Sequence, residues 1–140
     1  MNAVHRAVRR EVIHARGQEL GLMITVTAEI GNICVSSEVF TSTTGFAATN
    51  CFGVKGMAVR GVSDGLIHLL KKESGGKGVR VVRDADGSSI SIELHIIVEN
   101  GVNIPTVCAS IINEVKYVVE KMTGVKVSRV DVCVDSMIIS

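Results

Sequence analysis

The chain has 140 residues and a formal net charge of +1, with 46% hydrophobic side chains but only 3% aromatic ones. This composition suits one domain with an aliphatic core and excludes a chain that is disordered throughout. The near-neutral charge argues against binding to a phosphate backbone, and a chain without Trp offers little stacking surface for single-stranded nucleic acid.

Residues 1–22 are richer in arginine than the rest of the chain. Their valines recur at helical spacing (Val4, Val8 and Val12), which is typical of a basic amphipathic segment lying on an anionic membrane. A flexible tail and an extension upstream of the domain are the other two interpretations. We favour these two together because the valine face is short, and we predict one domain over residues 23–140.

The N-terminus has no apolar signal-peptide core, and no apolar run in the sequence reaches transmembrane length. The four cysteines are far apart and form no CxxC pair. We therefore expect a reduced, cytoplasmic protein in which the cysteines are mostly small core residues. They are Cys34, Cys51, Cys108 and Cys133.

Alternating side chains predict a β-hairpin over residues 23–36, with turn chemistry at Gly31-Asn32. Residues 37–51 predict a helix, with small side chains that permit close packing. One face of this helix combines Val39, Thr43, Phe46 and Asn50. A short strand at residues 54–59 and a short helix at residues 63–72 complete the first half of the chain.

The second half opens with a predicted strand at residues 78–84 and a turn at residues 84–87. Residues 88–99 alternate most plainly, with an apolar side chain at every second position. We therefore predict a central or nearly central strand here, with one face against a helix. In the last strand, at residues 125–135, the valines change phase, which predicts a bulge or bend at Ser128-Arg129.

The longest predicted element is a helix at residues 105–123, with Pro105 in its first turn and Gly124 just after its last. At 100° per residue, eight apolar side chains fall on one arc of roughly 140°. They are Val107, Cys108, Ile111, Ile112, Val115, Val118, Val119 and Met122. Strands and helices interleave around one sheet. The predicted fold is therefore α+β, a single two-layer domain with a mixed or antiparallel sheet and helices packed mainly on one face.

The histidines and cysteines lack the close pair spacing of a zinc site, and we predict no metal site, no cofactor and no catalytic residue. His95 and Cys133 are the one such pair that adjacent strands would place together. Four carboxylates could line the same sheet face, but exposed strand faces carry such charges without performing acid–base chemistry. They are Glu93, Glu99, Asp131 and Asp135.

A glycine-rich run between the short helix and the following strand resembles a phosphate-binding loop or the glycine loop of small RNA-binding domains. It lacks the spacing of a Walker motif, so we favour a plain glycine turn. The candidate binding surface combines this run with two asparagines that precede the long helix. Its residues are Gly75, Gly76, Lys77, Gly78, Asn100 and Asn103.

Several blocks of sequence carry a family resemblance. Each block is only weakly specific, but their order and spacing together are specific. The blocks are residues 31–39, 51–57, 64–66, 77–79, 96–105, 115–116, 122–125 and 130–132. Over residues 24–137 the chain resembles the alkaline shock protein family of Gram-positive bacteria, and within it the short, single-domain members. The resemblance implies a small cytoplasmic α+β protein linked to cell-envelope stress. It implies action by association, in some members at the membrane through a partner protein, and no catalytic residues.

We therefore expect a non-enzymatic envelope stress protein that binds an envelope or membrane-associated protein, with self-association left open and no membrane insertion of its own. The alternative is a regulatory accessory of a dihydroxyacetone-kinase-like enzyme of the fatty acid kinase type, because short family members are often encoded beside such a protein. A small RNA-binding module is the third and weakest hypothesis, since the neutral charge disfavours a nucleic-acid partner.

Overall fold

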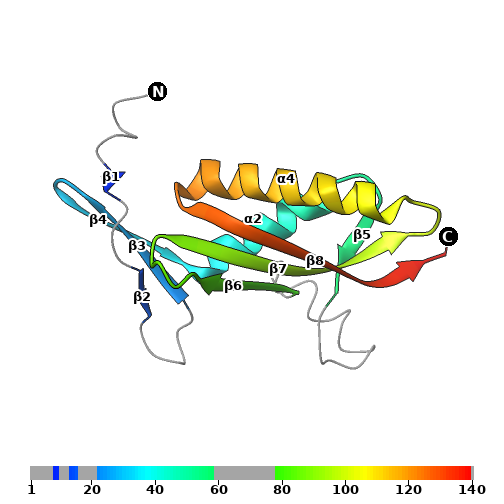
Figure 1. Cartoon of the computed structure of the whole chain (residues 1–140), viewed down its shortest axis with the longest axis horizontal. Coiled ribbons are helices and arrows are strands. Elements are labelled where there is room, and N and C mark those ends of the chain that lie inside the picture. The colour runs from blue at the N-terminus through cyan, green and yellow to red at the C-terminus, as the bar shows by residue number, and fades with distance from the viewer. Residues whose placement is uncertain (1–7, 10–12, 16–21, 59–77, 140) are drawn as a thin grey trace.

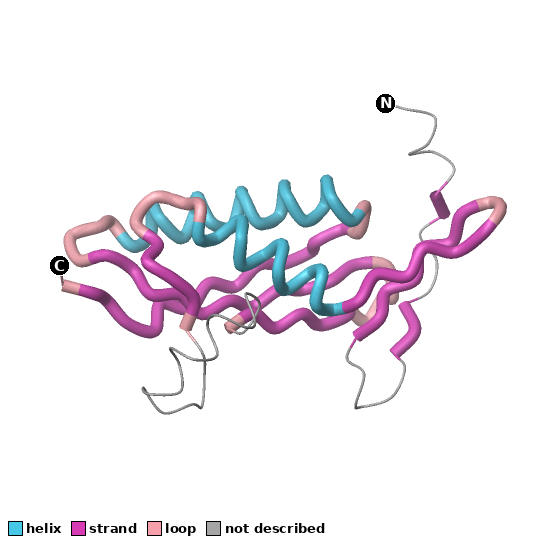
Figure 2. Tube along the Cα trace, turned by 180° about the vertical axis from the view of Figure 1, so that it is seen from behind, coloured by secondary structure: helices cyan, strands magenta, loops and turns pink. Residues whose placement is uncertain are grey.

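The computed structural model describes residues 8–9, 13–15, 22–58 and 78–139. These residues form two helices and two four-stranded sheets, and both helices cover the same side of the strands (Figures 1 and 2). In chain order the elements are β1 (Val8–Arg9), β2 (Ile13–Ala15), β3 (Leu22–Ala28), β4 (Gly31–Ser36), α2 (Ser37–Thr49), β5 (Val54–Met57), β6 (Val79–Arg83), β7 (Ser89–Glu99), α4 (Ile104–Thr123) and β8 (Lys126–Ile138). The predicted α+β fold class is confirmed, but the strands form two sheets where we expected one.

β7 is the centre of the larger sheet, as the alternation predicts. β8 pairs with it in parallel on one edge, while β5 and β6 pair with it antiparallel, end to end, on the other edge. A parallel pair needs a crossover connection, and α4 supplies it. Every second residue of β7 from position 90 to position 98 is apolar and at most 1% exposed, so this face of the strand lies in the core. These residues are Ile90, Ile92, Leu94, Ile96 and Val98.

The smaller sheet is built on β3, which pairs with β4 on one edge and with β1 and β2 on the other. The described parts of residues 1–22 are therefore strands rather than turns of an amphipathic helix. The β3–β4 hairpin is confirmed, but its turn lies at Glu29-Ile30 and not at Gly31-Asn32. The observed register places Val35 opposite the buried Ile24, so that both side chains reach the core.

α4 buries a narrower stripe than the predicted arc. Its buried side chains stand four residues apart: Val107, Ile111, Val115 and Val119. Ile112 is 36% exposed and Met122 is 67% exposed, so their predicted place in the core is wrong. The helix lies on a sheet with α2 beside it, and a cylinder on a flat layer contacts that layer along a narrow line. The predicted helix ends are confirmed, with Pro105 in the first turn and Gly124 at φ +71° after the last.

α2 also turns a different face inward from the one that we expected. Val39 and Phe46 are exposed, whereas small side chains and Phe40 are buried. α2 packs beside α4 as well as on the strands, and most of its buried residues are small, which permits a close approach. The predicted short helix at residues 63–72 lies outside the described residues.

The cysteines also differ from the prediction, because none of the four is fully buried. Cys34 is exposed, the other three are partly buried, and none forms a disulfide. Burial raises the pKa of the Cys51 and Cys108 thiols, although neither side chain is enclosed. The cysteines therefore lie at the margins of the core rather than inside it.

Three register shifts interrupt the strands that pair with β7, and each leaves a polar residue without a Cα partner. These residues are Lys55 in β5, and Ser128 and Asp135 in β8. The bulge at Ser128 confirms the prediction from the change of valine phase. Bulges re-aim side chains, and all three of these side chains make polar contacts. The Lys55 ammonium lies 3.7 Å from Glu99.

Candidate functional site

The sheet face opposite the helices carries the polar side chains of β7, and His95 stands near the middle of that strand. β5 and β6 meet end to end beside it. The His95 carbonyl accepts a hydrogen bond from the Ala58 N–H at 2.9 Å, and its N–H donates to the Gly78 carbonyl at 2.8 Å. Gly78 has φ +94°, and a Cβ there would lie 2.2 Å from the Ala58 carbonyl oxygen. Only glycine fits this junction, which fixes the His95 backbone from one side.

The His95 ring is held between two carboxylates. Nδ1 lies 2.9 and 3.1 Å from the two oxygens of Asp135, and Nε2 lies 2.9 Å from a Glu93 oxygen. The imidazole is only 9% exposed, whereas each carboxylate is about one-third exposed. Cys133 pairs with His95 across β7 and β8, so their predicted proximity is confirmed. One donor atom from each of Glu93, His95 and Cys133 lies within 4.8 Å of the others.

This arrangement raises the pKa of His95. The hydrogen bond to Asp135 is the largest cause, burial of the ring opposes it, and the contact with Glu93 raises the pKa further. A neutral imidazole has one N–H and cannot donate to both carboxylates, whereas an imidazolium donates to both. The cluster therefore favours a positive charge at the ring.

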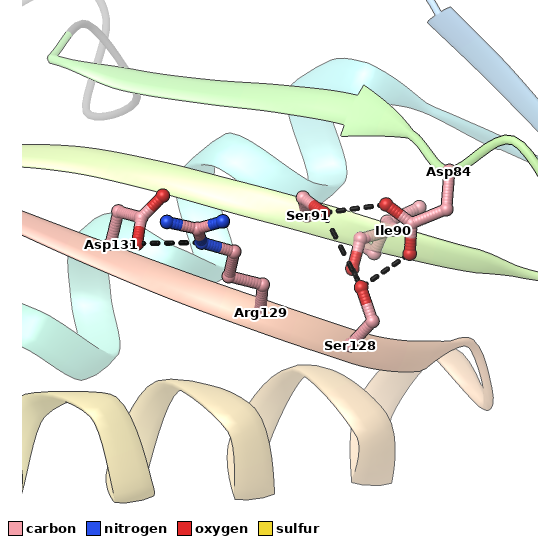
Figure 3. Close-up of polar contacts among 6 residues, drawn as sticks. All are labelled: Asp84, Ile90, Ser91, Ser128, Arg129 and Asp131. Atoms are coloured by element: carbon pink, nitrogen blue, oxygen red, sulfur yellow. Dashed lines mark hydrogen bonds and ion pairs between the residues drawn. The ribbon is translucent and has the colours of Figure 1, made fainter.

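A second polar cluster centres on Asp84, between the end of β6 and the bulge in β8 (Figure 3). Its carboxylate accepts hydrogen bonds from Ser89 at 2.6 Å, from Ser91 at 2.5 Å and from Ser128. The Ser128 hydroxyl also lies within hydrogen-bond distance of the Ile90 carbonyl oxygen, at 3.2 Å. These hydroxyls, Ser128 first, lower the pKa of Asp84. The cluster fastens three strands together, and sequence reasoning missed it because serines on an outward strand face carry no specific signal.

The remaining predicted carboxylates lie elsewhere on the sheet. Asp131 accepts a hydrogen bond from the Arg129 guanidinium at 2.9 Å, and both side chains are well exposed (Figure 3). Glu99 stands beside Lys55 at the far end of β7. The four carboxylates therefore divide between the His95 cluster and two surface ion pairs, and they do not form one acidic site.

Residues 25–139 match the model of the alkaline shock protein 23 family, whose description is a cell envelope-related function. The chain belongs to this family. It is 34% identical over 117 residues to the uncharacterised protein YloU of Bacillus subtilis, covering 83% of this chain and 96% of that protein. It is 32% identical to the uncharacterised protein Spy1614 of Streptococcus pyogenes, covering 83% of this chain and 95% of that protein. No solved structure matches the chain.

Among the described residues of this alkaline shock family chain, the three predicted candidates Gly78, Asn100 and Asn103 do not lie at one place. Gly78 lies beside His95, while Asn100 follows the end of β7, about 16 Å further along the strand. The Asn100 N–H donates to the Ile138 carbonyl at 2.9 Å, and the Asn103 side chain caps α4 by accepting from the Thr106 N–H at 3.1 Å. Residues 75–77 lie outside the described part of the chain, so a ligand role for the glycine run stays a prediction.

Three of the four aromatic side chains of this alkaline shock family chain are exposed, on α2, on α4 and in the turn that follows α2. The sequence has three Phe, one Tyr and no Trp. Phe40 is buried, but Phe46 is 66% exposed, Phe52 is 85% exposed and Tyr117 is 61% exposed. Across the described residues, neither helix is long and apolar enough to cross a membrane.

Proposed function

We propose that this protein takes part in a cell-envelope process as a non-enzymatic interaction protein, and that it binds an envelope-associated protein through its helical layer. The observation that carries the proposal is the exposure of Phe46, Phe52 and Tyr117 in a chain with so few aromatic side chains. Aromatic residues are enriched in the buried centres of protein interfaces, where they supply much of the binding energy.

Exposed aliphatic side chains on the same two helices support the same surface. We define the helical-layer surface as Val39, Phe46, Phe52, Ile112, Tyr117 and Met122, which are all exposed. α2 and α4 lie side by side, so a partner could contact both helices at once (Figure 2). The family's envelope-related description supports a partner at the envelope, which would place the protein at the membrane periphery without a span of its own.

Site-specific photocrosslinking in the native cell tests this proposal. A photoreactive phenylalanine analogue replaces Phe46 in one variant and, as the matched control, the exposed Arg80 of β6 in another. We expect an adduct with an envelope protein from position 46 and a much weaker adduct, or none, from position 80. Substituting Tyr117→Ser in the crosslinking variant should reduce the yield, because it removes a second aromatic contact.

Equal adducts at both positions, or no adduct at position 46, would contradict the proposal. An adduct with a dihydroxyacetone-kinase-like enzyme in place of an envelope protein would identify the regulatory accessory instead. Each variant is checked for folding by its thermal melting curve before crosslinking, because both replaced side chains point into solvent and should leave the fold intact.

A further inference from the structure

The polar cluster on the outward sheet face has the composition of a metal site. Glu93 offers a carboxylate oxygen, His95 an imidazole nitrogen and Cys133 a thiol sulfur, and one donor atom from each lies within 4.8 Å of the others. Nitrogen, sulfur and oxygen donors together suit Zn²⁺ better than Mg²⁺ or Ca²⁺, which prefer oxygen alone. We infer that these three side chains bind one zinc-type divalent ion, a property independent of the proposed partner surface.

Small side-chain movements would bring the three donor atoms, none more than 4.8 Å from another, to the distances that such an ion needs. Tetrahedral bonds of about 2.0 Å to nitrogen and oxygen and about 2.3 Å to sulfur separate the ligand atoms by roughly 3.3–3.6 Å. The His95 Nε2 and the Glu93 oxygen stand 2.9 Å apart and would need to separate by only a few tenths of an ångström. The Glu93 side chain is 33% exposed, so it can move without disturbing the core. Water can occupy the fourth position of the ion.

Asp135 occupies the place that an outer carboxylate takes in many zinc sites. A histidine ligand usually donates its second ring N–H to a carboxylate or carbonyl, which fixes the ring's orientation and strengthens the metal bond. Here Asp135 holds Nδ1 with both oxygens, and this leaves Nε2 toward Glu93 as the ligand atom. The bulge at Asp135 brings this carboxylate to the ring, so the outer contact is built into the strand.

The backbone under the cluster is rigid. Glu93 and His95 stand two residues apart on β7 and so share one face, and β8 places Cys133 directly opposite His95. His95 is also bonded through its N–H and its carbonyl to Gly78 and Ala58 on the other edge. Sites on paired strands hold their ligands more accurately than sites on loops.

Charge also favours a cation at this position. With two carboxylates at its two nitrogens, the ring satisfies both contacts only when a positive charge is present, either a second proton or a metal ion on Nε2. The two possibilities exclude each other at Nε2. A doubly paired imidazolium without metal is therefore the competing explanation, and a binding experiment distinguishes the two.

The test uses the full-length protein, reduced and freed of metal by chelation, with Co²⁺ as the spectroscopic probe and Zn²⁺ as the competitor. We expect one Co²⁺ per chain, with a thiolate-to-cobalt charge-transfer band that Zn²⁺ abolishes. The band should disappear in Cys133→Ser and persist in Cys34→Ser, a matched control on the exposed face of β4. Asp135→Asn should keep the band but weaken affinity by roughly 10- to 100-fold.

Glu93→Gln provides a second ligand variant in case Cys133→Ser loses its fold, and it should also weaken Co²⁺ binding. Zn²⁺ should raise the melting temperature of the wild type and of Cys34→Ser, and should raise that of each ligand variant by less at the same Zn²⁺ concentration. Failure of the folded wild type to bind Co²⁺ or Zn²⁺ stoichiometrically, or an unchanged cobalt band in Cys133→Ser, would overturn the inference. The first result would leave a doubly paired imidazolium as the explanation of the cluster, and the second would show that the cobalt binds at another thiol.

Discussion

Two neighbouring isoleucines on α4 test how the long helix is seated. Ile111 is 0% exposed, whereas Ile112 is 36% exposed, although both fall on the apolar arc that the sequence predicts. Ile111→Ala removes three buried carbon groups at about 0.8 kcal/mol each and leaves a cavity, so we expect a loss of about 3–4 kcal/mol. Ile112→Ala removes the same atoms from a position that is partly exposed to solvent. The better helix propensity of Ala also recovers about 0.4 kcal/mol of the lost free energy of unfolding. We expect a loss of about 1 kcal/mol or less.

Urea unfolding followed by circular dichroism measures both free energies, and an unchanged dependence on urea concentration shows that the two variants unfold from comparable states. The expected difference between them is about 2 kcal/mol or more. The two substitutions remove the same atoms from the same helix, so each is the control for the other. Losses equal within about 0.5 kcal/mol would refute the seating of α4 on the stripe through Ile111.

Three other predictions concern backbone conformation, a helix cap and pH. Gly78→Ala should lower the free energy of unfolding by at least about 3 kcal/mol, because its Cβ would lie 2.2 Å from the Ala58 carbonyl oxygen at a positive φ. Gly87→Ala is the matched control, because Gly87 has φ +74° with open space around it. In the same urea assay it should lower the free energy of unfolding by about 1–2 kcal/mol. Asn103→Ala should cost about 1 kcal/mol through loss of the α4 cap, and Asn103→Ser should restore most of it; no difference between the two would contradict the cap's role. The pKa of Asp84 is lower in the folded state than its usual value. Its hydrogen bonds therefore stabilise the fold at pH values above the unfolded-state pKa, and this stabilisation is lost as the pH falls through the folded-state pKa. The difference in unfolding free energy between wild type and Asp84→Asn should therefore shrink on acidification, and a constant difference would contradict this linkage.

The strands and helices could be predicted because local patterns determine them. The strict alternation of Ile90, Ile92 and Leu94 identifies a strand with one buried face, and the structure buries that face completely. Pro105 and Gly124 mark the ends of α4 through their backbone preferences alone. Such signals need no knowledge of which elements become neighbours.

The errors arose where neighbouring elements decide the outcome. Val39 and Phe46 are apolar positions of α2 that stay exposed, whereas the buried positions are mostly small residues, which permit close packing beside α4. The hairpin turn moved to Glu29-Ile30 because the register that brings Val35 to the core outweighed the turn preference of Gly31-Asn32. Neither competition can be evaluated from a single segment.

The alternation of side chains along the strands predicts only part of the His95 cluster. Period-two reasoning places His95 and Cys133 on one sheet face, and the structure confirms that they are neighbours. The same reasoning puts Asp135 on that face, but it does not predict its contact with the His95 ring, because Asp135 is the extra residue at a register shift in β8. The change in valine phase near Ser128 predicts the first bulge of β8. No valine follows Val134, so the sequence has no corresponding signal for the second bulge at Asp135.

The bulges therefore account for the polar contacts that alternation does not explain. In a regular β8, the partner of each β7 residue would follow in simple sequence, and no residue would be left over between two paired neighbours. The extra residues are Ser128, which donates to Asp84, and Asp135, which holds His95. Each departure from regular pairing costs ladder hydrogen bonds and places a polar group where the sheet uses it. The hydrogen bonds of Asp84 join neighbouring strands. The His95 cluster also contains a thiol and an imidazole nitrogen, which are not needed to join strands, and it is therefore the candidate site for a metal ion.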